Sequence, residues 1–375
     1  MLNRHRDRKV IISGGGTGGH VFPAIAIADG LKDKASDTDI LFIGAENRLE
    51  MEKVPEAGYR IIGLPVEGFK RKLTLRNIIV VFKLFRSLMI SRRIIKEFRP
   101  DVVVGVGGFA SGPVLRSAVV KGIPTLIQEQ NSFAGLTNKL LAKKARKICV
   151  AFEGMEKYFP CNKIVLTGNP VRKAIENLNK TNSKKEAYTY FGLEEGMKTI
   201  LVLGGSLGAR TINLGVIRNL SRIKGNGFQV LWQCGEYYHD EAMRAISESG
   251  SDNIIVKDFI SRMDLAYAVA DVIICRAGAI TISELFHAGK PAILVPSPNV
   301  AEDHQTKNAL SLVDKLAAIH LPDREAEQKM IPMALELLDD KERMKMISEN
   351  ISKLAVKNSA GKIAEEVLGM MKDEC

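Results

Sequence analysis

Val10-Ile-Ile-Ser-Gly-Gly-Gly-Thr-Gly-Gly-His20 is the stretch that decides how this chain folds. An apolar run breaks into five glycines within six residues, and the sequence after His20, with Pro23 in its first turn, is typical of a helix. A strand, a glycine turn and a helix can hold a phosphate, because glycine lets amides approach an anion and a helix start adds unpaired N–H groups. The helix dipole disfavours protonation of His20, so we expect a neutral ring that can accept a proton.

The same glycines permit a second interpretation. Gly14, Gly16 and Gly19 match the G-x-G-x-x-G pattern of dinucleotide-binding proteins, with Glu46 as the ribose ligand, and this would make the chain an NAD-dependent oxidoreductase. The pattern alone is weak, and the second half of the chain argues against it. A glycine turn without a ligand is a third interpretation, but five glycines carry an entropic cost that a bare turn does not need.

Length and composition limit the class of protein. A chain of 375 residues suggests two α/β domains, and 46% hydrophobic with 26% charged residues is typical of a soluble globular protein. The net charge of +11 indicates an acidic partner: nucleic acid, anionic lipid or a phosphorylated substrate. Five scattered cysteines without a CxxC pair predict a reducing cytoplasm, no disulfide framework and no zinc site. We expect no signal peptide and no membrane-spanning segment.

Both halves of the chain alternate apolar runs with helical segments, which predicts an α/β fold of two doubly wound, Rossmann-like domains facing a central cleft. The expected strands are 10–13, 40–44, 59–64, 102–106, 125–128, 148–151, 164–167, 199–203, 228–233, 253–256, 271–275, 291–295 and 317–320. The expected helices are 23–36, 46–57, 76–98, 113–121, 135–145, 211–220, 239–248, 261–269, 280–288, 304–315 and 360–371.

A composition shift separates the two predicted domains. Residues 173–198 are rich in Asn, Lys, Glu and Thr, and we place the linker near there. The predicted N-terminal domain is 1–170 and the predicted C-terminal domain is 171–357. The last helix, within 358–375, is expected to pack back on the N-terminal domain.

Further glycine loops and one acidic residue indicate phosphorylated ligands. Loops at 105–113 and 204–209 resemble the first one, so two phosphorylated ligands are expected in one cleft. In Arg276-Ala-Gly-Ala-Ile-Thr-Ile-Ser-Glu284, the amides of residues 279–281 would face a diphosphate, and Glu284 would accept both hydroxyls of a ribose. His304 and Gln305 suit sugar hydroxyls. A capping carboxylate at Glu284 and a solvated helix start at 304 remain alternatives.

The segment 70–99 holds ten Lys or Arg residues against one acid and many apolar residues. A helix with apolar and cationic side chains suits an anionic membrane surface, although a core helix with a solvated basic face is the alternative. We expect no nucleic acid, because the few aromatic residues lie among aliphatic ones and form no row of stacking platforms. The predicted membrane patch is Lys72, Arg76, Ile78, Ile79, Phe82 and Phe85.

Seven motifs occur together and in order along nearly the whole chain. They are Ser13-Gly-Gly-Gly-Thr-Gly-Gly-His20, Gly107-Gly-Phe-Ala-Ser-Gly-Pro113, Glu129-Gln-Asn131, Gly168-Asn-Pro-Val-Arg172, Gly204-Gly-Ser-Leu-Gly-Ala209, Arg276-Ala-Gly-Ala-Ile-Thr-Ile-Ser-Glu284 and Asp303-His-Gln305. This set resembles the MurG family, the peptidoglycan N-acetylglucosaminyltransferases of bacteria.

The resemblance implies a GT-B fold and an inverting, single-displacement transfer without metal or other cofactor. The donor would be UDP-N-acetylglucosamine. The acceptor would be undecaprenyl-diphospho-N-acetylmuramoyl pentapeptide (lipid I), and the product lipid II. The enzyme would be peripheral, on the cytoplasmic face of the bacterial membrane, because the acceptor lies in the inner leaflet.

The resemblance also implies site residues. His20 would be the base that takes the proton of the muramoyl 4-hydroxyl. The implied donor residues are Thr17, Gly18, Gly19, Asn131, Arg172, Ser206, Ile260 (through its backbone, to uracil), Ala279, Ile280, Thr281, Ile282, Ser283, Glu284 and Gln305. The implied acceptor-diphosphate residues are Gly14, Gly15, Gly16, Gly107, Gly108 and Ser111. Some family members carry histidine where this chain has Gln128, and this departure places more weight on His20.

Overall fold

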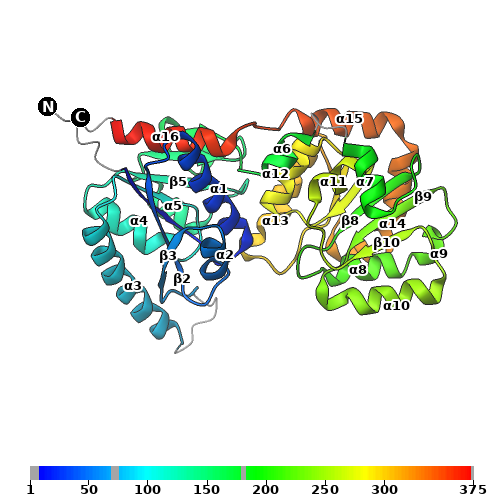
Figure 1. Cartoon of the computed structure of the whole chain (residues 1–375), viewed down its shortest axis with the longest axis horizontal. Helices are drawn as coiled ribbons and strands as arrows, with labels where there is room; N and C mark the ends of the chain where they lie inside the picture. Colours follow the sequence, from blue (N-terminus) through cyan, green and yellow to red (C-terminus); the bar gives the residue numbers. More distant parts are fainter. Residues whose placement is uncertain (1–7, 69–75, 179–182, 373–375) are drawn as a thin grey trace. The chain divides into compact units, whose positions relative to one another are not determined.

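The computed structural model describes residues 8–68, 76–178 and 183–372, and the chain forms two compact units. The first unit is built from residues up to Val171 and from Val356 onward, and the second from Arg172–Ala355 (Figure 1). Each unit contains one parallel sheet flanked by helices. This confirms the predicted fold class of two Rossmann-like domains.

The first unit holds a seven-stranded sheet in the order β3-β2-β1-β4-β5-β6-β7, with all pairs parallel. Its strands are β1 Lys9–Ser13, β2 Asp39–Ala45, β3 Arg60–Leu64, β4 Val102–Gly105, β5 Thr125–Glu129, β6 Lys147–Val150 and β7 Ile164–Leu166. Its helices are α1 Gly18–Lys34, α2 Glu50–Glu56, α3 Arg76–Phe98, α4 Ser111–Val120, α5 Leu136–Ala142 and α16 Ser359–Lys372, with 3₁₀ turns η1 Met155–Lys157 and η2 Cys161–Lys163.

Neighbouring side chains of the central strand β1 point into two different cores. In β1, Val10 and Ile12 pack with α1, α2 and α16, while Ile11 packs with α3, α4 and α5. Successive side chains of a strand face opposite sides of the sheet, so a strand buried on both sides must be continuously apolar. This explains why the expected strands of this unit are all present.

Helix α1 begins earlier than expected, at Gly18 instead of residue 23. Because glycine has a low helix propensity, the sequence predicts that the helix starts after the glycine loop. In the structure, Gly18 and Gly19 belong to the first turn of α1. His20 is therefore a residue of this first turn, and Pro23 lies inside the helix. The first-turn position of His20 follows from this start.

The second unit holds a six-stranded parallel sheet in the order β10-β9-β8-β11-β12-β13. Its strands are β8 Lys198–Leu203, β9 Phe228–Gln233, β10 Ile254–Lys257, β11 Val272–Cys275, β12 Ala292–Leu294 and β13 Ile319–His320. Its helices are α6 Lys173–Glu176, α7 Ser183–Phe191, α8 Arg210–Ile217, α9 Leu220–Ile223, α10 His239–Ser249, α11 Met263–Val269, α12 Ala279–Ala288, α13 His304–Val313, α14 Asp323–Asp339 and α15 Lys341–Ser352, with 3₁₀ turns η4 Glu236–Tyr238 and η5 Ala301–Asp303.

Two parts of the second unit differ from the sequence interpretation. The segment 173–198, interpreted as a linker, carries α6, α7 and the first residue of β8. Buried Ala187, Tyr188 and Phe191 give α7 an apolar face that its many polar residues concealed. Helices α14 and α15 were not predicted, although α14 buries a stripe that includes Met330 and Ile331.

Gly30 in α1 lies directly against α16. A Cβ atom at Gly30 would be 2.9 Å from the carbonyl oxygen of Ala360, whereas a Cβ at Gly369 in α16 would meet nothing within 4 Å. Alanine gains about 1 kcal/mol over glycine in a helix interior, but overpacking costs about 1–3 kcal/mol. The two glycines therefore form a matched pair.

We expect Gly30→Ala to lower the free energy of unfolding by about 1–2 kcal/mol, because backbone atoms of α16 have to shift. Gly369→Ala should leave that free energy unchanged or raise it by up to about 1 kcal/mol. Chemical denaturation followed by circular dichroism measures both. Equal stabilisation of the two variants would contradict the close packing of α1 on α16.

Candidate active site

Two glycine loops meet where the strand order of the first sheet reverses. Strands β1 and β4 are neighbours at the centre, and the chain leaves both at the same edge. A Cβ at Gly108 would lie 2.3 Å from the carbonyl oxygen of Gly15, and Gly108 has φ +83°. Only glycine fits at this position, so the loops after β1 and β4 form one surface that includes Gly14–Gly16 and Gly107–Gly108.

His20 lies between these two loops, in the first turn of α1. Its Nδ1 is 3.1 Å from the hydroxyl oxygen of Thr17. Its Cδ2 and Nε2 face the loop after β4, since a Cβ at Gly107 would lie 2.9 Å from each of them. The ring is partly exposed. The ring therefore contacts Thr17 through Nδ1 and lies against the second glycine loop with its Nε2 side.

A buried carboxylate holds the first glycine loop in place. Glu50, the first residue of α2, is 1% exposed, and its two oxygens accept the amide N–H groups of Ala45 and Gly16, both at 2.8 Å. The amide of Gly14 donates to the carbonyl of Ile43. Of the three glycines of this loop that are expected at the acceptor diphosphate, Gly14 and Gly16 therefore have amides with partners inside the protein. The sequence interpretation missed Glu50, because an acidic residue at a helix start is typical of a cap.

Ser111 and the amides after it begin helix α4. Its side chain is fully buried, and its hydroxyl donates to the carbonyl oxygen of Gly108 at 3.0 Å. The hydroxyl therefore fixes the second glycine loop instead of projecting from it. This gives Ser111 a bracing contact that the sequence did not indicate.

The segment after β5 is held by buried amides and a second buried carboxylate. Glu129 accepts from the backbone of Asn131 and Gly135 and from the side chains of Asn131 and Asn138. Burial raises the pKa of Glu129, while these N–H donors oppose the shift. The side-chain amide of Asn131 is thereby held beside β5, in the first unit.

Gln128 has a structural role. It is fully buried, its Nε2 donates to the side-chain oxygen of Asn169 at 2.8 Å, and its Oε1 accepts from Nε2 of Gln130. Gln130 also donates to the carbonyl of Val106 at 2.7 Å. An amide cannot titrate, so this chain handles no proton at position 128.

In the second unit, the loops after β8 and β11 lie at the corresponding reversal of strand order. Ser206 is exposed in the turn after β8. Helix α12 begins at Ala279, so the amides of Ala279, Ile280 and Thr281 lie in its first turn, as the motif predicts.

The next two residues of α12, Ile282 and Ser283, use polar groups in hydrogen bonds within the helix start, so these groups are less available to a ligand. The amide of Ile282 donates to the carbonyl of Gly278 at 2.9 Å, and its side chain is fully buried. The hydroxyl of Ser283 donates to the carbonyl of Ala279 at 2.9 Å. These two contacts lie after the amides of Ala279 to Thr281, which the motif predicts to face a diphosphate.

Glu284 is 7% exposed and has a different partner at each oxygen. Oε1 accepts from Arg172, with Nη2 at 2.9 Å and Nε at 3.2 Å. Oε2 accepts from the hydroxyl of Tyr267 at 2.9 Å. The structure therefore brings together two predicted donor residues, Arg172 and Glu284, and adds Tyr267, which the sequence did not indicate.

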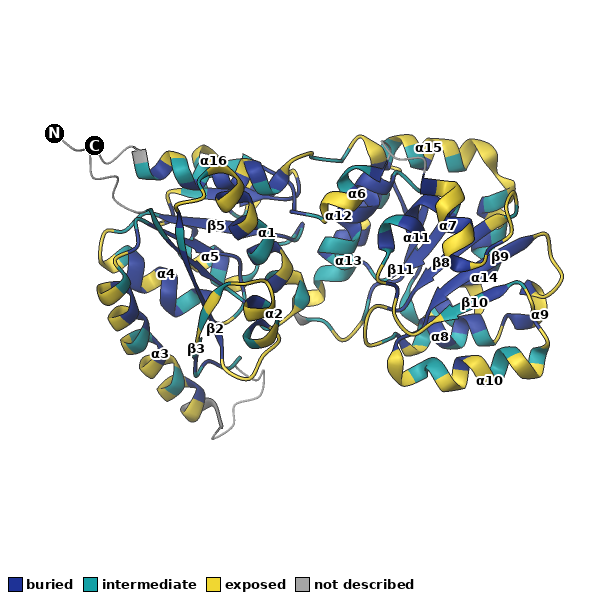
Figure 2. Ribbon diagram, viewed as in Figure 1, coloured by how far each residue is buried: buried dark blue, intermediate teal, exposed yellow. Residues whose placement is uncertain are grey.

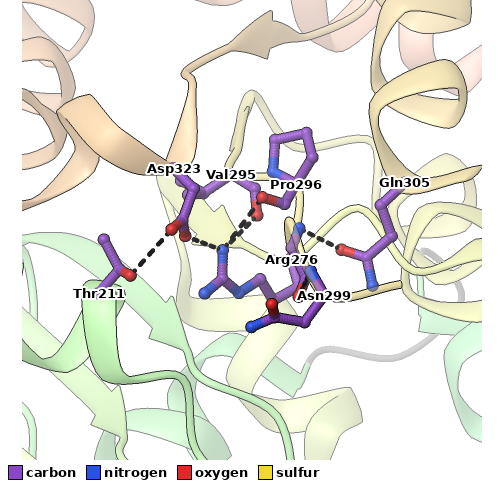
Figure 3. A network of polar contacts seen from close by, with 8 residues as sticks. Thr211, Arg276, Val295, Pro296, Asn299, Gln305 and Asp323 are labelled. Atoms are coloured by element: carbon purple, nitrogen blue, oxygen red, sulfur yellow. Dashed lines mark hydrogen bonds and ion pairs between the residues drawn. The ribbon is translucent and has the colours of Figure 1, made fainter. Parts of the chain in front are cut away.

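Ile260 and Gln305 each take part in a hydrogen bond between a backbone N–H group and a glutamine side-chain oxygen. The backbone N–H of Ile260 donates to Oε1 of Gln233 at 2.9 Å, so its carbonyl is the group left for a base. Oε1 of Gln305 accepts the amide of Ser297 at 2.8 Å, which orients its Nε2 as a donor (Figure 3).

Arg276 links the loops of the second unit in one polar network. It donates to the carbonyls of Val295 and Pro296 and pairs with Asp323, which also accepts from the hydroxyl of Thr211 at 3.0 Å (Figure 3). The network joins the starts of α8 and α14 to the loops after β11 and β12. Its members are far apart in the sequence, so no local pattern could reveal it.

The predicted membrane patch lies along α3. Lys72 is outside the described residues, and Arg76 and Ile78 belong to α3 by their backbone. Ile79, Phe82 and Phe85 are 54%, 70% and 60% exposed, and Figure 2 shows exposed residues along this helix. Val81 and Met89 extend the exposed apolar surface.

Comparisons with known proteins give a consistent result. Family models match the Glycosyltransferase family 28 N-terminal domain over residues 10–150 and its C-terminal domain over residues 199–367. A relative from Parabacteroides distasonis is 54% identical over 363 residues, covering 97% of this chain and 98% of the relative. One from Bacteroides fragilis is 56% identical over 362 residues, covering 96% and 95%. Both are named UDP-N-acetylglucosamine--N-acetylmuramyl-(pentapeptide) pyrophosphoryl-undecaprenol N-acetylglucosamine transferase.

A solved structure agrees with these relatives. The crystal structure of Acinetobacter baumannii MurG matches with a TM-score of 0.78 and 28% sequence identity. The match covers 96% of this chain and 99% of that one.

The contact of Glu50 with the glycine loop can be tested by Glu50→Gln. Glutamine offers one acceptor oxygen, so its NH₂ group would face one of the two amide N–H donors, and we expect a loss of about 1–3 kcal/mol in the free energy of unfolding. Glu52→Gln, on the exposed side of the same helix, should change it by less than about 0.5 kcal/mol. Chemical denaturation compares the two, and equal stabilities would argue against a bracing role.

Proposed function

The chain belongs to glycosyltransferase family 28 and, within it, to the MurG N-acetylglucosaminyltransferases, and we propose how its residues divide the reaction. The protein is a hexosyltransferase of peptidoglycan synthesis. It moves N-acetylglucosamine from UDP-N-acetylglucosamine to lipid I and so forms lipid II. The family resemblance is thereby confirmed, and the nicotinamide-dependent alternative has no support.

We assign the UDP moiety to the second unit. The first turn of α12 presents the amides of residues 279–281 to the diphosphate, where the helix dipole favours negative charge. Glu284 accepts hydrogen bonds from the ribose, and Arg172, on the same carboxylate, lies close to the donor. The carbonyl of Ile260 contacts uracil. Nε2 of Gln305 donates to the sugar.

We assign the acceptor diphosphate to the two glycine loops of the first unit. The amides of Gly14 and Gly16 have partners inside the protein. The first turn of α1, at Gly18 and Gly19, therefore supplies the amide contacts, and the loop at Gly107–Gly108 forms the other wall. This proposal places the acceptor diphosphate a few residues further along the chain than the sequence predicted, at Gly18 and Gly19, which the family resemblance had assigned to the donor.

His20 is the proposed base, and its orientation is the observation that carries the mechanism. We propose the tautomer in which Nδ1 donates its proton to the Thr17 hydroxyl, which places the lone pair on Nε2, the nitrogen that faces the second glycine loop. The muramoyl 4-oxygen attacks C1 of the donor sugar, its proton passes to Nε2, and the bond from C1 to the diphosphate oxygen breaks. The amides and dipole of α12 stabilise the negative charge on departing UDP.

The exposed apolar side of α3 is proposed as the contact with the membrane. Its phenylalanines are flanked by basic residues, a combination that suits an anionic lipid surface. Among the helices that the structure describes, none has the length and apolar character needed to cross a bilayer. We therefore place the enzyme peripherally, on the cytoplasmic face of the membrane, with lipid rather than nucleic acid as its anionic partner.

His20→Ala tests the proposed base. We expect turnover to fall on the order of 100-fold or more, with little change in UDP affinity, because the ring serves the acceptor hydroxyl and not the nucleotide. Transfer of labelled N-acetylglucosamine from its UDP donor to a lipid I analogue measures turnover, and calorimetry measures UDP binding. Near-normal turnover in the variant would remove His20 from this role.

Phe82→Ser with Phe85→Ser tests the membrane patch. Both rings are exposed, so the folded structure should tolerate the change, while binding to vesicles containing anionic lipid should weaken by on the order of tenfold or more. Phe259→Ser, at a ring that is 57% exposed in the second unit, is the matched control and should leave vesicle binding unchanged. Equal vesicle affinity in all proteins, measured by flotation, would place the membrane contact elsewhere.

A further inference from the structure

Tyr267 is a fully buried tyrosine whose hydroxyl contacts the proposed ribose ligand. It lies in α11 and is 0% exposed, and its hydroxyl donates to Oε2 of Glu284 at 2.9 Å. A side chain with no exposed surface cannot itself touch a nucleotide at the start of α12. Any influence of Tyr267 on ligand binding must therefore pass through the carboxylate of Glu284.

The two partners of Glu284 differ in how firmly they are held. The Arg172 side chain on Oε1 is 51% exposed, while the Glu284 side chain is 10% exposed. Tyr267 on Oε2 is enclosed by the core. A long exposed cation loses order easily, but a buried phenol has one position available to it. Tyr267 is therefore the fixed reference for the orientation of the carboxylate.

The chemistry of the phenol suits this task. Burial raises the pKa of Tyr267 well above its usual value, and the neighbouring Glu284 raises it further. The hydroxyl thus remains a hydrogen-bond donor over the whole physiological pH range. A carboxylate oxygen has two lone pairs. Tyr267 occupies one on Oε2 and leaves one acceptor position there, whereas two N–H groups of the exposed Arg172 lie on Oε1 and must give way before a ligand hydroxyl can bind that oxygen.

We propose that Tyr267 is a positioning residue that holds Glu284 in the orientation that accepts the ribose hydroxyls, and that it thereby sets the preference of the donor site for ribonucleotides over deoxyribonucleotides. The inference rests on the proposed binding of ribose by Glu284. Two neighbouring hydroxyls need an acceptor position on each oxygen at once: the one that Tyr267 leaves on Oε2, and one on Oε1 that Arg172 gives up when the ligand arrives. Without the phenol, Arg172 is the only partner left of the two, and the carboxylate turns toward it.

The test compares two ligands that differ at one hydroxyl. UDP and 2′-deoxy-UDP are titrated by calorimetry into the wild-type protein and into Tyr267→Phe, which keeps the ring and removes only the donor. We expect Tyr267→Phe to lower the ratio of the two affinities by about 3- to 10-fold, mainly through weaker UDP binding. Affinity for 2′-deoxy-UDP should fall less, because this ligand has only its 3′-hydroxyl to lose at Glu284 and keeps the contacts to uracil and diphosphate.

Tyr188→Phe is the matched control. Tyr188 is a buried tyrosine of the neighbouring helix α7, and the wild-type ratio is expected for this variant. A purely structural effect of losing a buried hydroxyl would weaken both ligands equally and leave the ratio unchanged. An unchanged ratio in Tyr267→Phe would therefore overturn the proposal.

Glu284→Ala distinguishes a failure of the positioning role of Tyr267 from a failure of the ribose assignment of Glu284. Loss of discrimination in Glu284→Ala together with an unchanged ratio in Tyr267→Phe refutes the positioning role and leaves the ribose assignment intact. Retained discrimination in Glu284→Ala refutes the ribose assignment itself.

Discussion

The contact of two glycine loops at the carboxyl edge of the first sheet is the constraint on which its site depends. Gly108 lies so close to Gly15 that no side chain fits between the loops. The same contact brings Gly107 against the ring of His20, while Thr17 engages the opposite side of the ring. The orientation of the proposed base, His20, thus follows from the packing of the two loop backbones and from the start of α1 at Gly18, two residues before His20.

In the second unit, the loops at the carboxyl edge of the sheet are also held together, by a glycine contact and by an ion pair. Gly208 and Gly235 bring the loops after β8 and β9 together, since a Cβ at Gly235 would lie 2.3 Å from the amide nitrogen of Gly208. The loops after β11 and β12 are joined instead by side chains, through the ion pair of Arg276 and Asp323. Both arrangements fix the edge of the sheet at the start of α12, where we propose that the nucleotide diphosphate binds.

The sequence predicted what depends on local pattern. Strands buried on both faces need unbroken apolar runs, so β1 and β8 were clear from their residues, and the start of α12 followed from a glycine after a strand. Partners that are far apart along the chain were not predictable. Glu50 reaches Gly16 across 34 residues and Tyr267 reaches Glu284 across 17, and nothing in either segment alone marks the pair. Helix α14 was missed because charged residues interrupt its narrow apolar stripe.

Three buried glutamates show why partner type, more than burial, separates a brace from a ligand-binding residue. Glu50 and Glu129 bind backbone and side-chain amides, which fold with them and do not leave. Glu284 instead holds a half-exposed guanidinium on one oxygen and a buried phenol on the other. An exposed cation can rearrange when a ligand arrives, whereas a backbone amide cannot. Of the three carboxylates, Glu284 alone combines a fixed partner with a movable one, and this combination suits the proposed recognition of two ribose hydroxyls.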